Sequence, residues 1–230
     1  MRLLMRNLPK KSEFQYFLRS VAIAAALLTC VLGISAGTDT AAGQAGTSEA
    51  KNQIAFQIQR LRQLPAAESA DAANDLDALR QSSSSLDSGL LFASLYQLQS
   101  PFFDMVMQQY VSTAGDVHDM DAFEKEWQRA GAELSKEESA LTEAKIRALP
   151  AAVRALVEAN QLQSRTLYNA GHLYGQETGV QNGLAYNGLA KGMMEFAAWA
   201  AGLKFPAGAP STIPSARNAA FTAFARAGLS

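Results

Sequence analysis

The densest set of possible metal ligands in the sequence lies within residues 115–121. Its members are Asp116, His118, Asp119 and Asp121. Carboxylates and an imidazole can bind a divalent cation, but a calcium loop also needs a glycine and a closing glutamate, and zinc needs further His or Cys ligands. The same stretch begins a predicted helix, where Asp121 and Glu124 have the spacing of a capping box. We therefore expect helix capping here and no metal.

A second set of side chains that could bind a ligand lies on two predicted helices near the end of the chain. Its members are Tyr168, His172, Tyr174, Glu177 and Trp199. Tyr168 and His172 are one helical turn apart, so their side chains can touch. Such groups suit a small-molecule pocket or a partner surface, whereas a histidine inside a helical hairpin also occurs as a packing residue. We treat them as candidate ligand or partner contacts and assign no catalytic residue.

The composition excludes several kinds of site. The chain has two histidines and one cysteine, Cys30, and it carries neither a Gly-x-Ser-x-Gly nor a phosphate-loop motif. We therefore expect no cofactor and favour a protein that is not an enzyme. The net charge is −1, and five of the basic residues lie in the first twenty positions. Because the remaining chain is mildly acidic and has no basic stripe, we expect no nucleic acid as a partner.

The elements that must position the second set are two helices within Pro150–Leu203. Four glycines recur there at every fourth residue: Gly171, Gly175, Gly179 and Gly183. Glycine costs a helix roughly 1 kcal/mol relative to alanine, so each one needs a reason. A turn through Glu177–Gln181, with Asn182 capping the next helix, explains the middle glycines. Close packing of two helices in a soluble hairpin explains Gly171 and Gly192.

The preceding chain also has helical periodicity. Leu86–Val111 is its most apolar part after the leader, and Pro101 divides it into two helices or kinks one. Ser82–Ser85 is predicted to break the chain before it. A solvated helix should then run from Asp121 to about Ala148, with apolar residues at heptad spacing. We predict an all-α, single-domain bundle of about six or seven helices over residues 51–204, with a C-terminal helical hairpin.

The ends of the chain have different compositions. A basic stretch followed by the apolar run Val21–Ile34 predicts a signal peptide or signal anchor over residues 1–36. Residues 37–50 are rich in Gly, Ala, Thr and Ser, which predicts a flexible linker. Residues 205–230 form a Pro- and Gly-rich tail that ends in a short predicted helix. We expect an exported protein, periplasmic or extracellular, or one anchored in the cytoplasmic membrane through its N-terminal segment if this is not cleaved.

One segment of the hairpin resembles a known family. Its small and large residues, Leu167, Ala170, Gly171, Tyr174, Gly183 and Ala190, are spaced as in one tetratricopeptide unit. The resemblance covers about 30 of the 230 residues. Asn187 and Glu195 stand where that family prefers a large apolar residue and a proline. The resemblance implies a helical scaffold that binds proteins.

These observations lead to two hypotheses about function. The preferred one is a non-enzymatic, exported or membrane-tethered protein of the cell envelope that acts through protein contacts. The alternative is a small-ligand-binding protein or enzyme whose pocket lies between the 150–203 hairpin and the 86–111 helices. The partner and the ligand cannot be named from the sequence.

Overall fold

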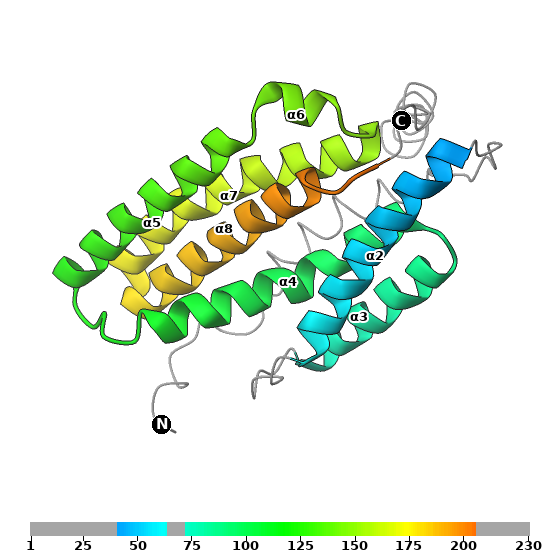
Figure 1. The fold of residues 1–230 in the computed structure, drawn as a ribbon. Helices are drawn as coiled ribbons and strands as arrows, with labels where there is room; N and C mark the ends of the chain where they lie inside the picture. The colour runs from blue at the N-terminus through cyan, green and yellow to red at the C-terminus, as the bar shows by residue number, and fades with distance from the viewer. Residues whose placement is uncertain (1–40, 64–71, 206–230) are drawn as a thin grey trace, which may run out of the picture. The chain divides into compact units, whose positions relative to one another are not determined.

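The apolar periodicity of the sequence folds into helices throughout the part of the chain that is described. The computed structural model describes residues 41–63 and 72–205, and these contain seven helices and no strand (Figure 1). The helices are α2 (Ala41–Gln63), α3 (Ala72–Asp87), α4 (Leu91–Thr113), α5 (Met120–Ala140), α6 (Glu143–Arg147), α7 (Ala151–Thr178) and α8 (Val180–Ala201). The all-α prediction is confirmed for these residues. The predicted leader of residues 1–36 and the tail from residue 206 lie outside them.

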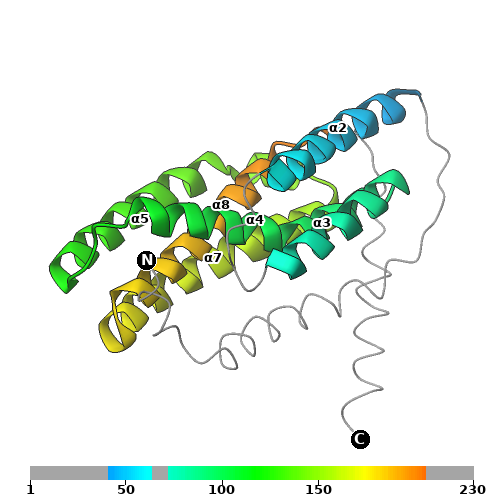
Figure 2. The same cartoon turned by 90° about the horizontal axis from the view of Figure 1, so that it is seen from below.

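Helix α8 is the centre of the bundle. Its most extensive contact is with α7, followed by α4 and α5, and both views show it lying among these helices (Figures 1 and 2). Leu184, Ala190 and Phe196 are completely buried, although they lie on different sides of the helix. A helix that is apolar on every side is buried on every side. The predicted hairpin is therefore α7 and α8, and its second helix forms the core.

The two helices of the hairpin are joined by one residue. Gly179 has φ 111° and ψ 152°, a backbone conformation that residues with a side chain rarely adopt and that glycine adopts freely. The sequence predicts a longer turn, through Glu177–Gln181, with Asn182 as the cap of the second helix. That detail is wrong, because the Nδ2 atom of Asn182 donates to the backbone oxygen of Thr178 at 3.2 Å and to its Oγ1 at 2.9 Å. Asn182 therefore stabilises the end of α7.

Glycines let α8 approach its neighbours closely. The predicted close contact within the hairpin is confirmed at Gly171, whereas Gly192, which was predicted at the same contact, faces α4. A Cβ atom added to Gly171 would lie 2.8 Å from the Cβ of Tyr186 and 3.2 Å from the backbone oxygen of Gly183. A Cβ atom added to Gly192 would lie 3.0 Å from the Cα of Phe103 on α4. At these two points helices pack backbone against backbone, so a larger residue must displace one of them.

The long helix predicted from Asp121 to about Ala148 is two helices. Helix α5 begins one residue earlier than expected, because Asp119 is the cap and accepts a hydrogen bond from the backbone N of Ala122 at 2.8 Å. It ends at Ala140, and the side chain of Thr142 caps α6. A threonine at that position supplies the oxygen that starts a new helix.

The N-terminal half differs from the prediction at two points. Residues 41–50 are helical in α2, although their composition predicts a flexible linker over 37–50. Ser82–Ser85 continues α3 where a break was predicted, and the buried Oγ of Ser82 donates to the backbone oxygen of Ser94 at 2.9 Å. Pro101 lies inside one helix, α4, so of the two predicted alternatives the division into two helices is wrong. Within residues 41–63 and 72–205, no helix has both the length and the hydropathy needed to cross a membrane.

Candidate functional site

Tyr168 and His172 face α5, where both rings stack on Trp127. The ring centroid of Trp127 lies 4.8 Å from that of Tyr168 and 4.1 Å from that of His172. The hydroxyl of Tyr168 donates to the backbone oxygen of Trp127 at 2.9 Å, and the indole Nε1 of Trp127 donates to the backbone oxygen of Tyr168 at 3.3 Å. Buried tyrosine and tryptophan commonly satisfy their polar atoms in this way. The cluster ties α5 to α7.

The polar atoms of this cluster are paired with one another. Nε2 of His172 lies 2.7 Å from Oε2 of Glu124. The hydrogen bond from His172 lowers the pKa of Glu124, and burial raises the pKa of Tyr168. Gln176 places its Nε2 3.3 Å from the same nitrogen of His172. A histidine that pairs with a carboxylate and stacks on an aromatic ring is more typical of helix packing than of ligand binding.

The other three members of the predicted set lie elsewhere. Tyr174 stacks on Tyr186 with ring centroids 4.7 Å apart, and burial beside Tyr174 raises the pKa of Tyr186 to about 12. Glu177 is exposed in the last turn of α7. Trp199 stacks on Phe102 of α4, with centroids 6.1 Å apart. The five residues therefore do not converge on one site.

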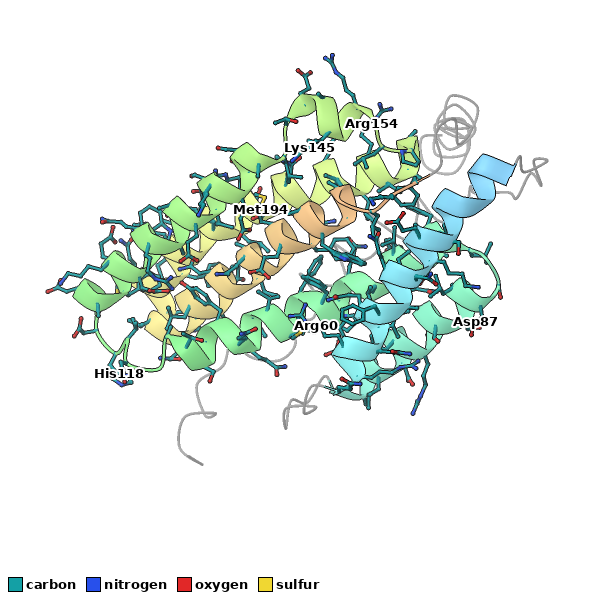
Figure 3. The ribbon with its side chains drawn as sticks, in the orientation of Figure 1. Arg60, Asp87, His118, Lys145, Arg154 and Met194 are labelled. Carbon is teal, nitrogen blue, oxygen red and sulfur yellow. The ribbon has the colours of Figure 1, made fainter. Side chains whose placement is uncertain are left out.

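The weak metal candidates lie in the loop that joins α4 to α5 and in the first turn of α5, which contains Asp121. The prediction that Asp121 caps the helix is wrong, because Asp119 is the cap. His118, Asp116 and Asp121 are exposed, and Figure 3 shows His118 in this loop. The fourth candidate, Asp119, is the cap of α5. Among the described residues, no three His, Cys, Asp or Glu side chains are grouped in a way that could hold a metal ion.

A network of charged side chains lies between α5 and α8. Its members are Glu126, Arg129, Glu133 and Glu137 on α5 and Lys191 and Glu195 on α8. Nζ of Lys191 lies 2.8 Å from Glu133 and 3.9 Å from Glu195. Arg129 pairs with Glu126 and Glu133 on its own helix. Because the α5 residues recur every three or four positions, they form one stripe that faces α8.

The carboxyl groups of this network have opposite pKa shifts. The hydrogen bond from Lys191 lowers the pKa of Glu133. Burial, reinforced by the nearby charge of Glu195, raises the pKa of Glu137, whose Oε2 is buried without a hydrogen-bond partner. Burial also raises the pKa of Glu195, and Lys191 and Arg60 of α2 oppose this shift. Raised carboxyl pKa values occur at catalytic sites and in structural ion networks alike. Sequence reasoning missed the network because it joins helices far apart in the chain.

Next to the network lie two buried polar side chains, Asn187 of α8 and Tyr110 of α4. Asn187 is completely buried. Burial raises the pKa of Tyr110 far above its usual value, the neighbouring carboxylate of Glu126 adds to this shift, and Asn187 opposes it. Tyr110 therefore connects Asn187 with the charged network.

A cleft of about 470 Å³ opens where α5 ends and α7 begins. It is lined by Glu138, Leu141, Glu143, Ile146, Arg147, Arg154, Glu158 and Gln161. Figure 3 shows Arg154 beside α6. The sequence led us to expect a pocket between the hairpin and residues 86–111. In the structure this place is the contact of α8 with α4, where the helices touch, and a Cβ atom on Gly188 would lie 2.8 Å from the Cα of Met107. The cleft at the end of α5 is lined by none of the residues of the charged network.

The outer side of α7 carries no charge over most of its length. Between Glu158 and Glu177, its exposed residues are Ala159, Leu162, Thr166, Asn169, Leu173, Tyr174 and Gln176. Leu162 is 71% exposed and Leu173 is 58% exposed. A solvated helix face normally carries charged residues. We call Ala159, Leu162, Thr166, Asn169, Leu173 and Gln176 the α7 stripe. The stripe could have been recognised in the sequence from uncharged residues that recur at spacings of three and four.

Comparison with known proteins adds no assignment. No protein-family model, no curated protein and no solved structure matches this chain. The tetratricopeptide resemblance of residues 165–195 therefore stays a prediction.

Proposed function

We propose that the helical domain is a non-catalytic protein-binding domain of an exported or membrane-tethered protein of the cell envelope. The α7 stripe is the observation that carries this proposal. Two leucines three turns apart lie on an uncharged helix face, which is the composition of a surface that becomes buried on binding. Burying each leucine contributes about 1.5–3 kcal/mol, so the pair can provide much of the affinity of a modest complex.

A comparison with α2 supports a specific role for the stripe. Phe56 on α2 is 68% exposed, which is close to the exposed fraction of Leu162. Its exposed neighbours on that helix, Asn52, Gln59 and Arg60, are polar or charged. Isolated apolar residues are common on protein surfaces and need no partner. On α7, in contrast, all the exposed residues between Glu158 and Glu177 are uncharged, and charge returns only at these two glutamates, one turn beyond each leucine.

The side chains of the predicted site support a non-catalytic role. His172 is engaged by Glu124 and Trp127, and its neighbour Tyr168 donates its proton to a backbone oxygen. General acid–base catalysis needs a group within hydrogen-bond reach of a substrate. These two side chains direct their polar atoms at α5. The location in the cell envelope rests on the sequence of residues 1–36.

Photocrosslinking in the intact cell tests this function. A photoreactive amino acid is placed at Leu162, at Leu173 or, as the matched control, at Phe56. We expect covalent protein adducts from both α7 positions and none from Phe56. If α7 gives no more adduct than Phe56, the stripe is an ordinary surface and the proposal is wrong.

The cleft supports a second candidate function, binding of a small ligand. Its volume of about 470 Å³ lies within the range of ligand pockets, roughly 300–1,000 Å³. Leu141 and Ile146 give it an apolar side. Two arginines and three glutamates also line it, and of these Arg147 pairs with Glu143 while Glu138 pairs with Arg165 outside the cleft. A small amphipathic carboxylate would therefore be recognised through Arg154. Titration of a panel of fatty and aromatic carboxylates by NMR should move cleft resonances, and Arg154→Gln should abolish the shifts.

A further inference from the structure

We propose that the C-terminal half of α5, residues 132–140, is a pH-sensitive element: it packs on α8 while the carboxyl groups between the two helices hold a proton, and it loosens when they lose it. The carboxyl groups are those of Glu137 on α5 and Glu195 on α8. This inference goes beyond the proposed function, because it involves no residue of the α7 stripe. It also differs from an effect of pH on the whole fold, since one half of one helix moves.

The two halves of α5 are held in different ways. In the N-terminal half, Phe123 is completely buried, and Trp127 stacks on Tyr168 and exchanges two hydrogen bonds with it. In residues 132–140, Leu134 is the only large apolar residue, and it is buried. The C-terminal half therefore depends on its charged contacts. A segment with few buried apolar contacts is the part of a helix that opens most readily.

The charges at the contact of this half with α8 do not balance. Nζ of Lys191 lies 2.8 Å from Glu133 and 3.9 Å from Glu195. The hydrogen bond from Lys191 lowers the pKa of Glu133, so this carboxylate stays ionised. Oε2 of Glu137 is buried and has no hydrogen-bond partner among the described residues. Three carboxyl groups thus share Lys191, and a buried carboxylate without a donor is costly to ionise.

Protonation of Glu137 and Glu195 favours the packed form. Burial raises the pKa of Glu137, and the charge of Glu195 adds to this shift. Burial also raises the pKa of Glu195, although Lys191 and Arg60 of α2 oppose the shift. When the half loosens, both carboxyl groups return to water and to their ordinary pKa of 4.5. Their contribution to packing is therefore fully present below about pH 4.5 and is lost as the pH rises through the raised values.

The packing of this half also shapes the cleft. Glu138 and Leu141, at the end of α5, line the cleft together with residues of α6 and α7. Because Glu138 belongs to the half that loosens and Leu141 directly follows it, this wall of the cleft moves with the half. The element therefore links pH to the site of the second candidate function.

Hydrogen exchange of the full chain, followed by mass spectrometry, tests the proposal. Without its contacts this short stretch cannot remain a stable helix, so loosening exposes its amides to exchange. Rates at pH 5 and pH 7.5 are divided by the intrinsic exchange rate at each pH. We expect residues 132–140 to lose protection at least about threefold between pH 5 and pH 7.5, relative to residues 120–131 and α4.

Variants assign the effect to its groups. Glu137→Gln and Glu195→Gln remove the two titrating groups at nearly constant volume. Together they should keep residues 132–140 protected at both pH values, and either one alone should remove part of the difference. Glu138→Gln is the matched control, because it breaks the pair with Arg165 on the α7 side of the same half. It should lower protection at both pH values and leave the pH difference in place.

Three outcomes would overturn the proposal. A pH difference that persists in the double variant would mean that other groups cause it. An equal loss of protection in α4 or in residues 120–131 would mean that pH acts on the whole domain or on the whole of α5. A natural chain without a pH difference in residues 132–140 would show that the half does not respond to protons.

Discussion

The two long faces of α7 contain similar kinds of residue for different reasons. On the inner face, Gly175 leaves space for the ring of Phe123, since a Cβ there would lie 2.4 Å from a ring carbon. Ser164 is completely buried and donates to the backbone oxygen of Ala190 at 2.6 Å. These two residues of the inner face are each explained by a neighbour. On the outer face, Leu162 is 71% exposed, and the packing of the described residues does not account for it.

The difference teaches how to separate residues that serve folding from residues that serve binding. A change on the inner face should act on the free energy of unfolding, because another helix occupies the space. A change on the outer face should leave the free energy of unfolding almost unchanged and act on association.

The strongest effect is expected where α8 meets its neighbours. Gly171→Leu and Gly192→Leu should each destabilise the domain by about 1–3 kcal/mol or more, because the new side chain must displace α8 or α4. Ala159→Leu, which adds a leucine to the outer face of α7, is the control and should change stability by less than about 0.5 kcal/mol. Denaturant unfolding of the three variants decides this, and equal effects on both faces would contradict the comparison.

Gly131→Ala should be destabilising by about 1 kcal/mol. From the sequence alone, Gly131 falls on a helix that looks solvated, and the same change would be expected to stabilise the domain or leave it unchanged. A Cβ atom there would lie 2.2 Å from the hydroxyl of Tyr168, which donates to the backbone of Trp127. In a Tyr168→Ala background the obstacle is gone, and the same change should stabilise the helix by up to about 1 kcal/mol. Thermal unfolding of the four variants tests this change of sign.

Replacing Glu137 or Glu133 of the charged network by glutamine should change the free energy of unfolding in opposite directions, and both changes should depend on pH. The pKa of Glu137 is raised on folding, so its ionisation lowers stability as the pH rises from about 4.5. Glu137→Gln should therefore stabilise the domain slightly at pH 7, and the gain should vanish in acid. The pKa of Glu133 is lowered by Lys191, so the stability that it provides is present above about pH 4.5 and is lost as the pH falls through the lowered pKa. Glu133→Gln should therefore destabilise at pH 7 and have no effect in strong acid. Unfolding curves across the pH range check both signs.

Local patterns in the sequence predicted the centre of the fold. The apolar spacing of α8 and the glycines of the hairpin are short-range signals, and they placed both helices and their close contact correctly. Long-range contacts could not be read in the same way. Gly131 looks exposed until Tyr168 is placed over it, and Lys191 meets Glu133 only after folding.

The candidate site was predicted less well than the fold. Sequence reasoning selected polar and aromatic residues, and it correctly placed Tyr168 and His172 one turn apart on one helix. It did not find their shared partner, Trp127, and it did not separate them from Trp199. The α7 stripe was missed because it consists of ordinary residues whose meaning depends on exposure. Exposure follows from which face of α7 the other helices cover.

The central claim is that the outer face of α7 serves association and not folding, and one variant tests it directly. Leu162→Glu should leave the free energy of unfolding within about 0.5 kcal/mol of the natural chain. With a photoreactive amino acid at Leu173 in the intact cell, the natural chain should form protein adducts that Leu162→Glu loses. Unchanged adduct formation by Leu162→Glu, or destabilisation as large as that of Gly171→Leu, would contradict the claim.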